Sequence, residues 1–279
     1  MHKRRAPAFA AALVGLLLGG AANAAENAVP SCHAALATGL VQPRPTREIF
    51  VFVDQTTSLD DALRADVHDR LAPLLKPGMA FTVASFSAYG QGRYATVISA
   101  GVTEADMPAS QRNEMSVPKL KKLDDCLRAQ LPFARKTMNA AIDTALAGSS
   151  AELANSEILA SLKQLSARVA GSKAPGRTVV VVSDMIEHSG VTSFYKKSAL
   201  RTIDPATEMA KVQAAGLIGN FGGTSVTVIG AGALPPGKPS ARRGTAEMAA
   251  LEAFWRQWFT ASNAKLKEFG QPSLLQAIQ

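Results

Sequence analysis

The chain has 279 residues, of which 47% are hydrophobic and 19% are charged, as in an ordinary globular protein. Its length allows one large domain or two small ones. It carries 30 basic and 22 acidic residues, but the basic residues are scattered and are not interleaved with aromatic ones. This pattern argues against a nucleic-acid-binding surface, and it leaves acidic partners or envelope surfaces as the classes that a mildly basic protein favours.

Residues 1–24 predict a signal peptide. A basic start, "MHKRR", precedes a short apolar stretch, "APAFAAALVGLLLGG", and "AANA" ends in a small-x-small cleavage pattern. The alternative is a membrane anchor, but the apolar stretch is shorter than the roughly 20 residues that a spanning helix needs. Cleavage near Ala24 predicts a bacterial protein that is periplasmic or secreted, with no later membrane span. It would remove three of the 30 basic residues, leaving 27 against 22 acidic ones and a net charge of +5.

The two cysteines, Cys32 and Cys126, are expected to form a disulfide, because an exported pair in an oxidising compartment is normally oxidised. The bond would join the N-terminal segment to "LDDCLRAQLP". The alternative for Cys32 is lipidation, since "VPSC" faintly resembles a lipoprotein signal. Polar residues separate this cysteine from the apolar stretch, so the disulfide is the favoured interpretation.

Strands and helices alternate along most of the chain. Residues 25–46 are predicted to be an irregular, proline-containing lead-in, and 47–279 to form one domain. We expect strands at 47–53, 79–87, 92–102, 174–184 and 224–232, and helices at 59–75, 137–147, 152–170, 204–217 and 245–269. Residues 103–135 show no readable order. The alternation predicts a three-layer α/β fold, with an open, mostly parallel sheet, helices on both faces and one antiparallel edge strand.

Two of the most hydrophobic strands each end in an aspartate. "EIFVFVD" ends at Asp54, and "TVVVVSD" ends at Asp184. In open α/β sheets ligands bind at the carboxyl ends of the strands, so two neighbouring strands would bring both carboxylates to one edge. Such a pair repels unless a cation or a proton lies between the two groups.

Hydroxyl residues follow the first of these aspartates in the pattern Asp54-x-Thr56-x-Ser58. A carboxylate and two neutral hydroxyls suit a hard cation such as Mg²⁺. Here the sequence resembles the von Willebrand factor A domain family, whose metal-ion-dependent adhesion site uses Asp-x-Ser/Thr-x-Ser after the first strand, a threonine from a second loop and an aspartate after the fourth strand. The resemblance covers about residues 47–269.

The resemblance implies a metal site made of Asp54, Thr56, Ser58, Thr137 and Asp184, holding Mg²⁺ (or Mn²⁺ or Ca²⁺). Thr137, in "KTMNAAIDTAL", stands where the family has Thr-Gly-x-Ala-Leu at the start of a helix. Met138 and Met185 replace two glycines of the family pattern. The family's function implies that this chain binds a partner protein, whose acidic side chain completes the coordination of the cation, and that it is not an enzyme.

Three alternatives remain open. Thr56 and Ser58 could cap the helix that follows, with Asp54 bonded to loop amides. The protein could be a metal-independent structural or assembly component of a bacterial envelope or secretion system. A hydrolase is less favoured, because the dehalogenase-like pattern needs a second aspartate where Thr56 stands, and the nucleophile-elbow, phosphate-loop and dinucleotide motifs do not occur. Glu187 and His188 are interpreted as loop residues.

Overall fold

The computed structural model describes residues 27–40, 43–87, 95–149, 155–196, 199–233 and 244–278. Among them, six strands form one sheet in the order β3-β2-β1-β4-β7-β8. Neighbouring strands are parallel except β3, which pairs with β2 in antiparallel orientation at one edge. The bounds are β1 (Arg47–Asp54), β2 (Met79–Phe86), β3 (Thr96–Val102), β4 (Gly176–Val182), β7 (Thr224–Ile229) and β8 (Ala264–Phe269). The predicted fold class is confirmed.

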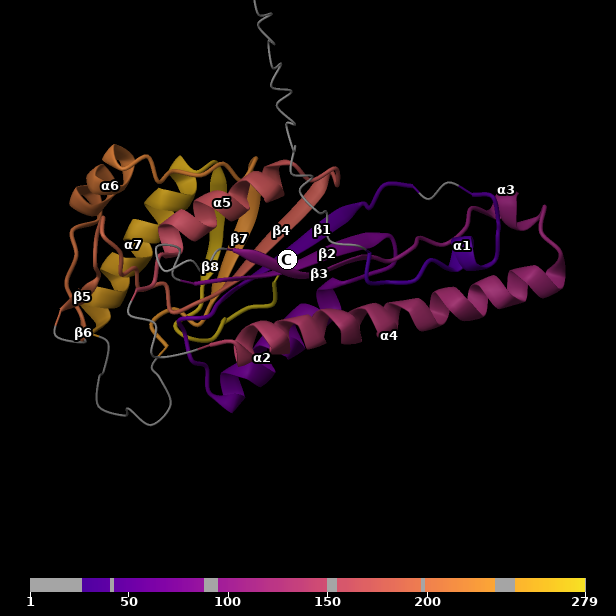
Figure 1. Cartoon of the computed structure of the whole chain (residues 1–279), viewed down its shortest axis with the longest axis horizontal. Coiled ribbons are helices and arrows are strands. Elements are labelled where there is room, and N and C mark those ends of the chain that lie inside the picture. The colour runs from indigo at the N-terminus through magenta and orange to yellow at the C-terminus, as the bar shows by residue number, and fades with distance from the viewer. Residues whose placement is uncertain are drawn as a thin grey trace, which may run out of the picture.

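Helices cover both faces of this sheet (Figure 1). One face packs against α5 (Ile158–Ala170), α6 (Pro205–Ala214) and α7 (Thr245–Ala261), and the other against α2 (Asp61–Leu71), the short 3₁₀ helix η1 (Ala72–Leu74) and α4 (Val117–Ala147). Side chains alternate along β1, so that Phe50 and Phe52 enter the first core while Val51 and Val53 enter the second. The central strands are therefore buried on both sides, as their hydrophobic runs predicted.

The last long helix, α7, contributes four aromatic side chains to the core. Phe254, Trp255, Trp258 and Phe259 are fully buried, and the two tryptophan rings lie 5.6 Å apart in an edge-to-face arrangement. Each indole N–H donates to a backbone carbonyl, Trp255 to Met185 and Trp258 to Leu217. These aromatic residues of α7 pack in the core on one face of the sheet.

Helix α4 extends well past the edge of the sheet (Figure 1). Its 31 residues correspond to about 46 Å of α-helix, and α1 (Cys32–Ala35) and α3 (Ala109–Arg112) lie beside its first half. The disulfide between Cys32 and Cys126, with Cα atoms 5.8 Å apart, fastens the lead-in to α4. The buried carboxylate of Glu104 adds to this connection, because it accepts hydrogen bonds from the Cys32 backbone N–H and from Gln130.

Several predicted helices have wrong bounds, and the one at 152–170 begins only at Ile158. The short helix at 137–147 is only the last third of α4. The final helix ends at Ala261 rather than Phe269, because Asn263 adopts a left-handed conformation (φ 53°) and the chain turns into β8. A small hairpin of β5 (Tyr195–Lys196) and β6 (Ala199–Leu200) was not predicted.

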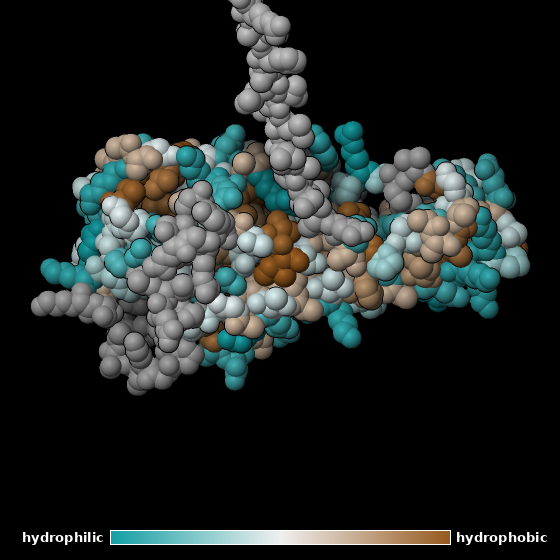
Figure 2. Space-filling model, in the orientation of Figure 1, coloured by the Kyte–Doolittle hydropathy of each residue, from teal (hydrophilic) through white to brown (hydrophobic). Residues whose placement is uncertain are grey.

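The predicted signal peptide at 1–24 lies outside the described residues. Within the described part of the chain, none of the helices combines the length and apolar character needed to cross a bilayer. On the face seen in Figure 2, hydrophobic residues occur as small separate patches among hydrophilic ones. This distribution agrees with a core that lies between the helices and the sheet.

Candidate functional site

Asp54 and Asp184 lie at the carboxyl ends of adjacent strands. β1 and β4 pair in parallel with Val53 opposite Val182, so Asp54 is the last residue of β1 and Asp184 follows β4 by two positions. Thr57 bridges the two segments: its hydroxyl donates to the Asp54 Oδ2 at 3.2 Å and accepts from the Asp184 backbone N–H at 3.1 Å. The predicted convergence of the two strand ends is confirmed.

The carboxylate of Asp54 is buried and surrounded by donors. Ser183 Oγ donates to Oδ2 at 2.6 Å, and Thr56 donates to Oδ1 through its hydroxyl at 2.5 Å and its backbone N–H at 2.8 Å. Burial raises the pKa of Asp54 above its ordinary value, although these hydrogen bonds act in the opposite direction. Asp54 is thus held in one orientation, with a charge that is costly to bury without a counterion.

Thr56 joins this group to a second loop. Its hydroxyl lies 2.7 Å from the Ser156 Oγ, two residues before α5 begins. Ser156 was not among the predicted site residues, because Thr137, before an earlier helix, matched the second-loop pattern of the resembled family. A usable signal was present, since "NSEIL" places a hydroxyl residue at the start of the helix that leads directly into the four-valine strand.

The alternative interpretation of Thr56 and Ser58 as helix caps is wrong. Asp60 caps α2, because its side chain accepts from the Leu63 backbone N–H at 2.8 Å. The Ser58 hydroxyl is half-buried and makes no hydrogen bond to another described residue. The other half of that interpretation holds, since Asp54 does bond to the backbone N–H of Thr56.

Thr137 does not reach this edge of the sheet. It lies inside α4, twenty residues after the helix begins, and its hydroxyl donates to the Phe133 carbonyl at 3.0 Å. The part of α4 near the site is Ala145, whose carbonyl accepts from the Gln55 side chain. Eight helical residues, about 12 Å, separate Ala145 from Thr137. The predicted position of Thr137 at a helix start is therefore wrong, and the second-loop hydroxyl that contacts Thr56 is that of Ser156.

Asp184 is oriented by the loop that follows it. Its Oδ1 accepts from the Ile186 backbone N–H at 2.9 Å, and the Tyr195 hydroxyl lies 3.4 Å from Oδ2. Met185 adopts a left-handed conformation (φ 61°) where the resembled family has glycine. A methionine in this conformation is strained, but its buried side chain and the hydrogen bond from Trp255 to its carbonyl hold it there. The turn after Asp184 forms without the glycine.

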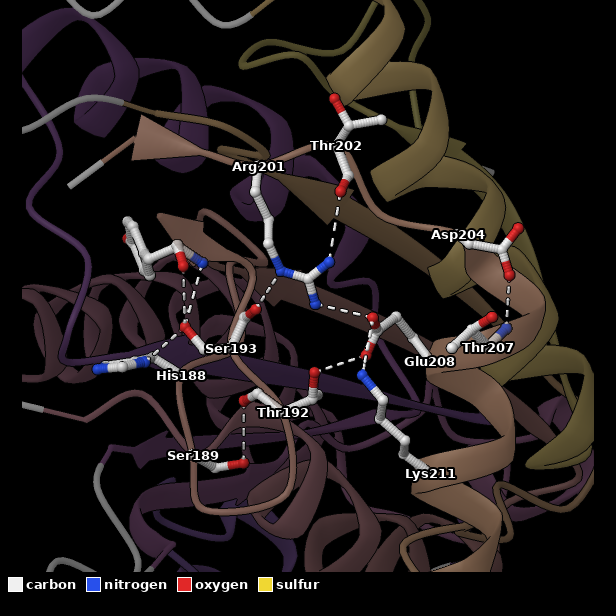
Figure 3. Close-up of polar contacts among 11 residues, drawn as sticks. His188, Ser189, Thr192, Ser193, Arg201, Thr202, Asp204, Thr207, Glu208 and Lys211 are labelled. Carbon is white, nitrogen blue, oxygen red and sulfur yellow. Dashed lines mark hydrogen bonds and ion pairs between the residues drawn. The ribbon is translucent and has the colours of Figure 1, made fainter. Parts of the chain in front are cut away.

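A buried ion-pair network anchors the same loop to α6 (Figure 3). The Glu208 carboxylate accepts from Arg201 at 2.7 Å, from Lys211 at 3.0 Å and from the Thr192 hydroxyl at 2.6 Å. These partners lower the pKa of Glu208 against the effect of its burial. Since Arg201 also donates to the Ser193 carbonyl, the network fixes the loop that carries Tyr195.

Glu187 and His188 contact the start of α5 and the loop that carries Ser156. The Glu187 carboxylate is buried and accepts from the Leu159 backbone N–H at 3.0 Å, in the first turn of α5. Burial raises the pKa of Glu187 to about 8. His188 exchanges two backbone hydrogen bonds with Ser156, and its Nδ1 lies 2.8 Å from the Ser193 Oγ. Both residues therefore position the Ser156 loop, and the interpretation of His188 as a loop residue is consistent with these contacts.

These contacts bring together two carboxylates, of Asp54 and Asp184, and the hydroxyls of Thr56 and Ser156, while Ser58 follows Thr56 by two residues. Hard oxygen donors of this kind, few of them charged, are the ligands that Mg²⁺ prefers. Within the described residues, no three or more His, Cys, Asp or Glu side chains cluster as metal ligands do. The residues present fit a hard divalent cation.

No family model matches the chain, and no curated protein is similar to it. Among solved structures, it is similar to an aerotolerance-related membrane protein from Bacteroides fragilis NCTC 9343 with multiple mutations to serines. The identity is 14%, the TM-score is 0.35, and the match covers 80% of this chain and 89% of the other. The fold class of this protein follows from its own sheet order and not from this match.

Proposed function

We propose that this protein is an exported von Willebrand A-like module that binds a partner protein through a divalent cation. The observation that carries the proposal is the hydrogen-bonded contact between Thr56 and Ser156 beside two aspartates from adjacent strands. Asp54, Thr56, Ser58, Ser156 and Asp184 would hold the cation, directly or through water. Bound there, the cation would supply a positive charge able to accept a carboxylate from the partner.

The chain's own residues prepare this edge for a cation. Thr57 and Ser183 hold the Asp54 carboxylate, and the Ile186 N–H holds that of Asp184. Because the pKa of Asp54 is raised, protons compete with the cation, and affinity should decrease as the pH falls. The disulfide supports export to an oxidising compartment, periplasmic or secreted.

Manganese titration tests the proposal directly. Wild-type protein should bind Mn²⁺ at one site, with Mg²⁺ as a competitor, when followed by calorimetry and by the electron paramagnetic resonance of free Mn²⁺. Asp54→Asn and Asp184→Asn should each weaken binding at least about tenfold, because each removes one of the two charges in the donor set. Asp61→Asn, an exposed aspartate on α2, is the matched control. Mn²⁺ affinity that is unchanged in both site variants would refute the proposal.

A metal-independent assembly component is the second candidate function. It is favoured by one observation: both oxygens of Asp54 already accept hydrogen bonds from neighbouring residues, so the carboxylate has a structural role without a cation. If wild-type protein binds no Mn²⁺ and Asp54→Asn lowers only the free energy of unfolding, this second function is the better one.

A further inference from the structure

An open cavity of about 620 Å³ lies at the end of the sheet opposite the candidate cation site. It is bordered by the end of α2, by η1, by the first residues of β1 and β2, and by the C-terminal tail, residues 270–278. Arg47 and Met79, which begin β1 and β2, line it. Asp54 is seven residues further along β1, about 23 Å away, so the two places are independent.

Specific hydrogen bonds hold the tail that forms one wall of this cavity. Two nitrogens of the Arg70 guanidinium donate to the carbonyls of Leu274 and Gln276, at 2.6 and 2.7 Å. Glu268 accepts from the Leu275 backbone N–H at 2.6 Å, and the Leu274 side chain is buried. Bonds to charged groups are stronger than neutral ones. The tail, which ends near the middle of the view in Figure 1, is thus a fixed wall.

The lining of the cavity joins apolar and cationic groups. Leu74, Met79 and Ile278 contribute apolar surface and pack against the core beneath, and the Leu275 side chain, 96% exposed, stands at the rim. Three cations and one carboxylate, Asp69, complete the lining. Arg70 is engaged with Asp66 and the tail, whereas the exposed side chains of Arg47 and Lys76 make no hydrogen bond or ion pair with any described residue.

We propose that this cavity binds an amphiphilic anion: a single apolar chain that ends in a carboxylate or phosphate. The chain would lie against Leu74, Met79 and Ile278, and Arg47 and Lys76 would hold the headgroup. A small inorganic anion would leave the apolar wall in water, and a neutral amphiphile would leave both cations without a partner. The volume lies within the range of small-molecule sites, about 300–1,000 Å³.

Calorimetric titration of the full chain with matched ten-carbon ligands, each below its micelle concentration, tests this proposal. Decanoate and decyl phosphate should bind saturably at one site. The ratio of their dissociation constants identifies the preferred headgroup. Decanol should bind at least about tenfold more weakly, because it lacks the charge that the cations recognise. Decyltrimethylammonium and inorganic phosphate should not bind measurably.

Variants separate the two halves of the site. The double variant Arg47→Gln/Lys76→Gln should weaken decanoate about tenfold and leave decanol unchanged, whereas Leu74→Asp should weaken both. Lys136→Gln, an exposed cation on α4, is the matched control, and Asp54→Asn should bind decanoate normally. Equal affinity for decanoate and decanol, full affinity in the double variant, or binding of acidic peptides but of no ten-carbon anion would each overturn the proposal. Circular dichroism and thermal melts identify any variant that fails to fold.

Discussion

Glu187 offers a direct test of the electrostatics beside the candidate site. Its carboxylate is completely buried, and one oxygen accepts from the Leu159 N–H in the first turn of α5. Glu187→Gln replaces it with a side chain of the same shape that is neutral at every pH and still accepts from the Leu159 N–H. The variant therefore removes the titration while keeping the hydrogen bond to α5.

The size and sign of the effect follow from the pKa. Burial raises the pKa of Glu187 from 4.5 to about 8, and one unit corresponds to about 1.4 kcal/mol. The raised pKa of Glu187 therefore corresponds to roughly 4 to 5 kcal/mol of folding free energy. Because the folded value lies above the unfolded one, the contribution of the protonated carboxyl is complete below about pH 4.5 and is lost as the pH rises through about 8. Folding takes up a proton within this window.

Urea unfolding at several pH values between 5 and 9 measures this contribution. The free energy of unfolding of wild type minus that of Glu187→Gln should fall by up to about 4 kcal/mol from pH 5 to pH 8, at about 1.4 kcal/mol per unit. Glu114→Gln changes an exposed glutamate, and its free energy of unfolding should depend on pH as that of wild type does. A difference between wild type and Glu187→Gln that stays constant over this range would refute the argument, because Glu187 would then titrate alike in both states.

Two further predictions concern stability elsewhere. Replacing Cys32 and Cys126 by serine opens a loop with a sequence separation of 94 and should lower the free energy of unfolding by about 4 to 5 kcal/mol. Urea unfolding of wild type and the serine variant measures this loss. An unchanged unfolding midpoint would contradict the prediction. Asp204→Ala removes the side chain that caps α6 at the Thr207 N–H and should lower the free energy of unfolding by about 1 kcal/mol. Urea unfolding measures this change as well, with Asp61→Ala as the control.

Hydrophobic pattern predicted the local elements that dominate the core. β1, β2, β4 and β7 form where β-branched and aromatic residues recur, and α6 begins at Pro205, one residue after its predicted start. These features depend on interactions between near neighbours in the chain, which the sequence displays directly. The same pattern failed for α4, because Pro132 suggests a helix end. The disulfide and the Gln130–Glu104 bond that hold the first half of α4 come from distant segments.

The sequence by itself determined the alternation of strands and helices and the two aspartates at strand ends, because residue order and polarity are enough to specify them. Only the tertiary structure decided which second-loop hydroxyl joins them. The sequence alone does not distinguish Ser156 from Thr137, since both are hydroxyl residues near a predicted helix. In the structure, α5 starts beside Thr56, whereas Thr137 lies inside a helix that packs against one face of the sheet. The cavity beside Arg47 likewise needs segments more than 200 residues apart to meet, since no local pattern records which distant surfaces will be packed together.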